Sequence, residues 1–113
     1  MRLKSAIWVS AYIRRSHLEG AFAVVRRRGA EEAGAIFVKV SKLDGTAALF
    51  APAPQSEFDE ARQGDRRFTP AVEGFVAEAD IEKRLERQLK FDPDLWIVEV
   101  EDRAGRHFLD VTG

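Results

Sequence analysis

The chain has 113 residues, of which 45% are hydrophobic and 33% are charged, and its formal net charge at pH 7 is −1. These values are typical of one globular domain and exclude a mainly disordered or fibrous chain. Cysteine is absent, which excludes disulfides and thiolate metal sites, and no apolar run approaches the roughly 20 residues of a membrane span. The short apolar stretch at residues 6–13 runs into Arg14 and Arg15, so no signal peptide is expected and the cytoplasm is the expected location.

Residues 5–18 predict a first helix. Ser5 suits its N-cap and Gly20 suits the position after its last turn. A strand is the competing interpretation, because Trp8, Val9, Tyr12 and Ile13 favour β-structure, but the caps and the length favour a helix. The stripe expected at helical spacing consists of Ile7, Trp8, Ala11, Tyr12, Arg15 and Leu18.

Three segments with strand character follow, at residues 22–27, 35–42 and 46–51. The middle segment alternates, with Ile36, Val38 and Val40 on one face and Phe37, Lys39 and Ser41 on the other. Between the second and third segments, Asp44-Gly45 predicts a tight type I′ turn in which both residues have positive φ. We therefore expect an antiparallel meander, which Pro52 and Pro54 end.

The next stretch is less regular. Residues 53–65 lack periodicity and indicate a long exposed loop, which Phe58 would attach to the body. Residues 66–72 predict a short edge strand, because Pro70 has no backbone donor and is tolerated only at an edge.

Residues 78–90 give the clearest helical pattern. Ile81, Leu85 and Leu89 form an apolar stripe, which Ala77 and Phe91 would extend. The first turn is acidic and the last carries Lys90, as the helix dipole favours. The acid-first pairs four residues apart that are expected on this helix are Asp80–Arg84 and Glu86–Lys90.

A final hairpin is expected after Pro93. Residues 95–101 alternate as a strand, with Trp96, Val98 and Val100 on the inner face, residues 102–105 form a turn with Gly105 at its left-handed position, and residues 106–111 pair back. The predicted fold is a single α+β domain over residues 1–113, of order α-β-β-β-(β)-α-β-β. Its mostly antiparallel sheet has about five strands and carries both helices on one face.

Three blocks of this sequence resemble a known family. They are residues 2–9 (RLKSAIWV), 38–46 (VKVSKLDGT) and 91–102 (FDPDLWIVEVED), and together they resemble the family catalogued as domain of unknown function 1491. The resemblance extends over nearly the whole chain and implies a small, free-standing bacterial cytoplasmic protein. It implies no activity, cofactor or catalytic residue.

Charge is unevenly distributed along the chain. Residues 1–45 carry nine Lys/Arg against four acids, whereas residues 46–113 carry nine against fifteen. If the basic side chains converge, they would form a face that attracts phosphate, with Arg14, Arg15, Arg26, Arg28 and Lys39 as its candidate residues. The alternative is a solvated sheet edge whose charges oppose aggregation.

The final hairpin offers the one grouping that resembles a metal site or an active site. Glu101, His107 and Asp110, with Asp102 nearby, would supply nitrogen and oxygen ligands for a divalent cation if three of them converge. Ordinary cross-strand charge pairs around a turn are the simpler interpretation. No cofactor is expected, because the sequence contains no phosphate-binding glycine loop and no nucleophile elbow.

These patterns rank three functional hypotheses. The first is a small non-enzymatic binding or interaction module, with a protein partner or a second copy as possible partners and no membrane association. The second is an RNA or nucleotide binder that uses the basic N-terminal half. The third is a metal-assisted hydrolase at the final hairpin.

Overall fold

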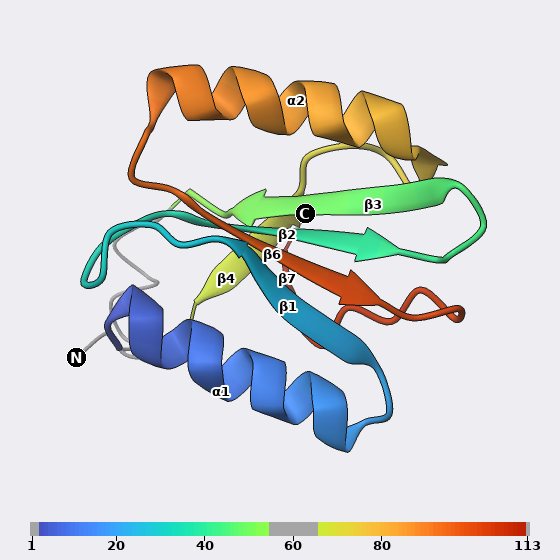
Figure 1. Ribbon diagram of the computed structural model, residues 1–113, viewed down its shortest axis with the longest axis horizontal. Coiled ribbons are helices and arrows are strands. Elements are labelled where there is room, and N and C mark those ends of the chain that lie inside the picture. The colour runs from blue at the N-terminus through green and yellow to red at the C-terminus, as the bar shows by residue number, and fades with distance from the viewer. Residues whose placement is uncertain (1–2, 55–65, 113) are drawn as a thin grey trace.

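The computed structural model describes residues 3–54 and 66–112, which form a mixed β-sheet with one helix on each side (Figure 1). The helices are α1 (Ser5–Leu18) and α2 (Glu78–Phe91), each of 14 residues. Neither is long and apolar enough to cross a bilayer. The strands are β1 (Phe22–Arg27), β2 (Ile36–Ser41), β3 (Thr46–Pro52), β4 (Arg67–Pro70), β5 (Val76–Ala77), β6 (Trp96–Glu101) and β7 (Asp110–Val111).

The strand order in the sheet is β1-β6-β2-β3-β4-β7, and β5 pairs with β3 beside this path. Four of the pairings are antiparallel, whereas β2–β6 and β4–β7 are parallel. The α+β class is therefore confirmed, but the sheet is mixed and has seven strands in the described ranges rather than about five. Helix α2 supplies the crossover that brings β6 alongside β2 in parallel.

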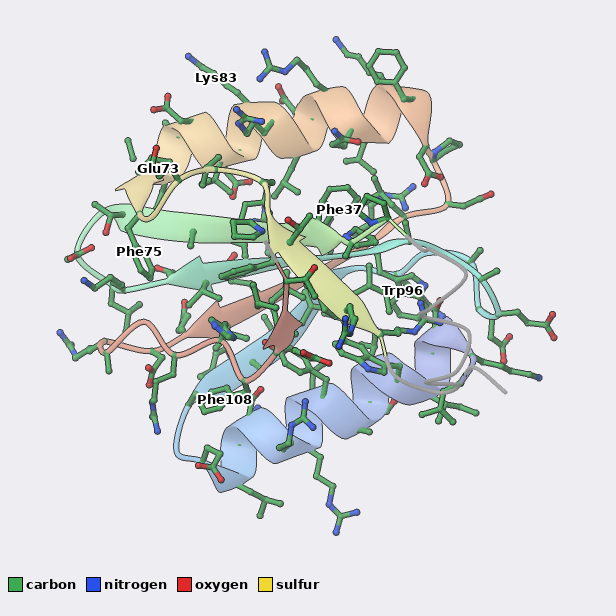
Figure 2. The ribbon with its side chains drawn as sticks, turned by 180° about the vertical axis from the view of Figure 1, so that it is seen from behind. Phe37, Glu73, Phe75, Lys83, Trp96 and Phe108 are labelled. Atoms are coloured by element: carbon green, nitrogen blue, oxygen red, sulfur yellow. The ribbon has the colours of Figure 1, made fainter. Side chains whose placement is uncertain are left out.

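The two helices cover opposite faces of the sheet, so the expectation of both on one face was wrong. Ile36, Val38 and Val40 of β2 belong to the cluster that packs on Val9 and Tyr12 of α1. Phe37 of the same strand belongs to a second cluster with Ile81 and Leu85 of α2. Figure 2 shows the labelled Phe37 on the α2 side of the sheet and Trp96 on the α1 side. All six side chains of β2 are buried, because this strand has a helix-covered layer on each face.

The predicted pairings of β1 with β2 and of β7 with β6 were also wrong. β1 pairs with β6 and not with β2, so the expected meander is interrupted by a strand from the far end of the chain. β6 has β1 on one side and β2 on the other, which leaves it no free edge for residues 106–111. β7 pairs instead with β4, so β4 is not an edge strand among the described residues. The predicted turn itself is present, with Gly105 at φ 74°.

The capping residues at the ends of the helices agree only in part with those predicted from the sequence. Gly20 has φ 89° and ends α1 as expected, with Ala21 N donating to Ser16 O at 3.0 Å. Ser5 is not the N-cap, which is Lys4; its Oγ instead donates to Gly34 O at 2.7 Å. Phe91 is 86% exposed and does not extend the α2 stripe.

The buried face of α1 also differs from the predicted stripe. It consists of Ser5, Val9, Tyr12 and Ser16, whereas Ile7 and Leu18 are 53% and 77% exposed. Of the predicted stripe, Tyr12 is buried in the core and Trp8 packs against it, so the prediction was right for these two aromatic residues and wrong for Ile7 and Leu18.

The β2–β3 hairpin is confirmed, but its turn is not type I′. Positive φ values occur at Leu43 (65°) and Gly45 (91°), and Asp44 between them has none. Asp44 Oδ1 instead accepts hydrogen bonds from Thr46 N at 2.9 Å and Thr46 Oγ1 at 2.6 Å. This side-chain bond favours the wider turn over the two-residue one.

The loop between β1 and β2 holds α1 to the start of β6. Ala30 N donates to Asp94 O at 2.8 Å, and Trp96 Nε1 donates to Ala30 O at 2.8 Å. A Cβ added to Gly29 would lie 2.6 Å from the carbonyl carbon of Leu95, so only glycine fits there. The exposed loop expected at residues 53–65, with Phe58, lies almost entirely outside the described residues.

Candidate functional site

Two of the five candidate polyanion-binding residues are part of an ion-pair network on the α2 face. Lys39 Nζ lies 2.7 Å from Glu82, 3.0 Å from Glu78 and 3.7 Å from Glu99. The Arg26 guanidinium contacts both Glu82 oxygens, at 2.7 and 2.8 Å, and Glu99 at 3.1 Å. Because carboxylates already surround these cations, the network attaches α2 to the sheet and presents little positive charge to a ligand.

The protonation states in the network follow from these contacts. The hydrogen bond from Arg26, aided by Lys39, lowers the pKa of Glu82 to about 2. Burial alone would lower the pKa of Lys39, but its hydrogen bonds to Glu82 and Glu78 outweigh burial and raise it. Glu82 and Lys39 are therefore both charged at neutral pH, as a stable ion pair requires.

The other three candidates lie elsewhere. Arg14 and Arg15 are on α1, beyond the opposite face of the sheet, and the Arg28 guanidinium lies 5.1 Å from the ring centre of Trp96. The structure therefore does not bring the five basic residues to one face.

The candidate metal ligands do not converge either. Asp110 Oδ2 lies 3.6 Å from Arg67 Nε, and Asp102 is paired with Arg106 at 2.7 Å. His107 Nδ1 accepts a hydrogen bond from Leu109 N at 2.9 Å, and burial lowers the pKa of its ring. In the described ranges no three His, Asp or Glu side chains are placed to hold a metal ion. The reason is topological, because β7 leaves β6 and pairs with β4.

A cleft of about 510 Å³ lies between α1 and the segment that leads into β7. It combines aromatic walls, two guanidinium groups and one carboxylate. The residues that matter for its chemistry are Trp8, Tyr12, Arg15, Arg66, Phe108 and Asp110.

The aromatic wall of this cleft is held rigidly. Trp8 stacks on Tyr12, with 4.9 Å between ring centres and 13° between planes, and also contacts Phe68. The Tyr12 hydroxyl donates to His107 O at 2.6 Å, and burial raises the pKa of this phenol. The half-buried Trp8 ring is therefore a fixed apolar surface that faces the cleft.

The two guanidinium groups stand on different parts of the cleft wall. Arg15 Nη2 donates to Phe108 O at 2.9 Å, and this bond orients the side chain. The guanidinium is exposed, and its remaining N–H groups can donate to a ligand. Arg66 Nη2 donates to Leu3 O at 2.8 Å and to Ser5 Oγ at 3.2 Å. Asp110, the carboxylate in the lining, lies 3.6 Å from Arg67, which is outside the cleft.

Phe108 occupies an unusual backbone conformation at this site. Its φ is 56°, in the left-handed region that costs a non-glycine residue roughly 1–2 kcal/mol. In this conformation its carbonyl accepts from Arg15, its ring lines the cleft, and Arg106 lies 5.1 Å from its ring centre. Strain of this kind persists where surrounding contacts fix it, often at functional sites.

Some residues of this cleft belong to a pattern that the sequence shows. Trp8, Tyr12 and Arg15 belong to the stripe predicted from helical spacing, but that spacing alone does not indicate the wall of a cleft. No pattern pointed to Arg66 or Phe108, which reach the cleft only because β7 pairs with β4.

The family model described as a protein of unknown function (DUF1491) matches residues 3–110. The chain belongs to the DUF1491 family. A crystal structure of a DUF1491 protein from Caulobacter crescentus CB15 is 43% identical, with a TM-score of 0.81 and full coverage of both chains.

Two further structures are similar over this whole chain. A solution structure of a protein from A. tumefaciens is 44% identical with a TM-score of 0.80, and the match covers 98% of that protein. An NMR structure of a DUF1491 protein from Caulobacter crescentus CB15 is 44% identical, also with a TM-score of 0.80 and 99% coverage of that chain. No curated protein matches. The DUF1491 match includes every cleft residue named above, from Leu3 to Asp110.

Proposed function

We propose that this DUF1491 protein is a small non-enzymatic binding module, and that the cleft between α1 and β7 takes a small anion that carries a flat apolar group. Nucleoside monophosphates have this chemistry. The observation that carries the proposal is the pairing of a fixed aromatic wall at Trp8 with guanidinium groups at Arg15 and Arg66 around one cleft of about 510 Å³.

Both the volume of the cleft and the chemistry of its lining suit such a ligand. Its volume lies within the range of small-molecule sites, roughly 300–1,000 Å³. Guanidinium groups bind phosphate and carboxylate through paired N–H donors, and an indole ring stacks on a planar base. Arg15 is thus the one sequence-predicted basic residue that supports an anion-binding role.

The same geometry favours binding over catalysis. The Tyr12 hydroxyl already donates to a backbone carbonyl, and its raised pKa makes it a poor base at neutral pH. The Asp110 carboxylate lies 3.6 Å from Arg67 Nε and is therefore already engaged with a cation of the protein. The cleft residues are therefore suited to hold and orient a ligand.

The test is calorimetric titration with adenosine monophosphate at about 50 mM salt, using Arg15→Gln and the matched control Arg14→Gln on the same helix. Arg14 is exposed and does not line the cleft. Loss of a charge-assisted hydrogen bond is worth about 1.5–3 kcal/mol, so Arg15→Gln should weaken binding about tenfold or more while Arg14→Gln leaves it nearly unchanged. Equal losses in both variants would indicate attraction by general positive charge and contradict a site in the cleft.

Two fragments separate the contributions to binding. Phenyl phosphate should bind more weakly than adenosine monophosphate but more tightly than inorganic phosphate, because only the first two offer a ring to Trp8. If single-stranded RNA binds and adenosine monophosphate does not, the ligand is a polymer and the small-molecule proposal is wrong.

A further inference from the structure

The side of α2 that faces residues 71–76 carries three cations that have no ion-pair partner among the described residues. Lys83, Arg84 and Arg87 have no carboxylate within 4.0 Å in the described part of the chain, and the predicted Asp80–Arg84 pair does not form. The acidic residues Glu78 and Glu82 instead face Lys39 and Arg26 on the other side of the helix. Helix α2 therefore directs Glu78 and Glu82 to the network, while its opposite flank carries three cations that have no ion pair within the described ranges.

These bases line two adjoining hollows beside α2. One, of about 450 Å³, is bounded by α2 and by Val72, Glu73 and Val76. The other, of about 140 Å³, has an apolar lining of Phe37, Leu49, Ala51 and Ala71. Arg84 and Arg87 line both, so the hollows form one groove along the helix. Figure 2 shows Lys83 projecting from α2, and Glu73 near the same end of the helix.

We infer that this groove is a docking surface for an acidic peptide segment of a partner protein. Carboxylates of the peptide would pair with Arg84 and Arg87, and one apolar side chain would lie against Ala51 and Ala71, which are half-buried. Charge complementarity would position the acidic residues of the peptide, and the apolar lining would accept its apolar side chain.

A peptide fits this groove better than a nucleic acid does. Phe37 is 8% exposed, so the groove offers little aromatic surface on which bases could stack. Glu73 and Asp80 line the larger hollow beside the cations and would repel a continuous phosphate backbone. A peptide can instead place its few carboxylates only where the arginines lie.

The experiment is fluorescence anisotropy with a labelled ten-residue peptide of Gly and Ser that carries a few Glu residues and one central Leu, at about 50 mM salt. The charge-reversal variant Arg84→Glu/Arg87→Glu should weaken binding at least tenfold. The control Arg14→Glu/Arg103→Glu changes the net charge equally at exposed positions outside the groove and should stay within about twofold of wild type. A peptide with Gly in place of the Leu should bind several-fold more weakly.

Other results would overturn the inference. Absence of peptide binding would do so, as would equal losses in the two double variants. A single-stranded oligonucleotide that binds more tightly than the peptide, with the same dependence on Arg84 and Arg87, would identify a polyanion groove instead. Circular dichroism checks that the variants fold, and Arg84→Gln/Arg87→Gln repeats the test with a milder change. Because all these residues lie outside the α1 cleft, adenosine monophosphate binding should be nearly unchanged in every one of these variants.

Discussion

Replacement of Lys39 by Met tests the ion-pair network directly. The Lys39 side chain is 5% exposed, and its ammonium lies within 3.7 Å of three carboxylates, those of Glu78, Glu82 and Glu99. Methionine preserves most of the apolar length of the side chain and removes its charge. The variant therefore leaves three acids with Arg26 as their remaining partner, and Arg26 contacts only two of them.

The expected loss follows from the exposure of these groups. Removal of one partner from a fully buried ion pair costs about 3–5 kcal/mol. Here the three carboxylates retain side-chain exposures of 35%, 40% and 14%, so water stabilises part of their charge. We therefore expect Lys39→Met to lower the free energy of unfolding by about 2–3 kcal/mol near neutral pH.

The loss should depend on pH in a defined direction. The pKa of Glu82 is about 2 in the folded protein against an ordinary value of 4.5, so its contribution to stability is present above about 4.5 and disappears as the pH falls toward 2. The deficit of Lys39→Met should shrink over the same range, because protonated carboxylates need no cation.

Urea unfolding at about pH 7 and about pH 3 measures both effects. Lys83→Met is the matched control, since Lys83 is exposed on α2 and has no ion pair in the described ranges, and it should change stability by no more than about 0.5 kcal/mol. A Lys39→Met deficit under about half a kcal/mol near neutral pH, or one that does not change with pH, would refute the reasoning.

Three further predictions concern stability. Leu85 is 2% exposed in the cluster beneath α2, so Leu85→Ala should lower the free energy of unfolding by about 2–5 kcal/mol in urea. Arg87→Ala should lower it by less than about 0.5 kcal/mol, and similar losses in the two variants would mean that the α2 stripe is not a packing face. Gly29→Ala should destabilise the protein by about 1–3 kcal/mol or more, because the new Cβ meets the backbone of Leu95; a rise in melting temperature would contradict that contact. Burial lowers the pKa of the His107 ring from 6.5, so the unfolded state binds a proton more readily than the folded state does. The free energy of unfolding should therefore fall as the pH drops below about 6.5, and His107→Gln should lack this dependence. If the wild-type profile is as flat as that of His107→Gln between about pH 7.5 and 5.5, the prediction is wrong.

Local features of the fold were readable from the sequence. Both helices start and end within a residue of the predicted bounds, because periodicity, Gly20 and Pro93 are local signals. The strands β2, β3 and β6 and the turn at Gly105 were predicted for the same reason. Phe37 was a missed signal, since an apolar residue on the second face of β2 indicates a strand with both faces covered.

Strand order was not readable in this way. Insertion of β6 between β1 and β2 joins β6 to segments that are 60 to 79 residues away in the sequence, and no local pattern specifies such a pairing. The site predictions depended on that order. His107 and Glu101 would be near neighbours only in a β6–β7 hairpin, and the cleft at Trp8 exists only because the last segment turns back toward β4 and α1.

The central claim, a ligand site in the α1 cleft, is tested most directly by chemical-shift mapping with adenosine monophosphate. The two indole N–H groups provide an internal comparison, because Trp8 lines the cleft whereas the Trp96 Nε1–H is bonded to Ala30 O in a 1%-exposed side chain. We predict that the Trp8 indole and the amides of Leu3 and Leu109 shift on titration while the Trp96 indole stays in place. If none of these signals has moved by about 5 mM ligand, or if the shifts concentrate on α2 instead, the cleft is not the binding site.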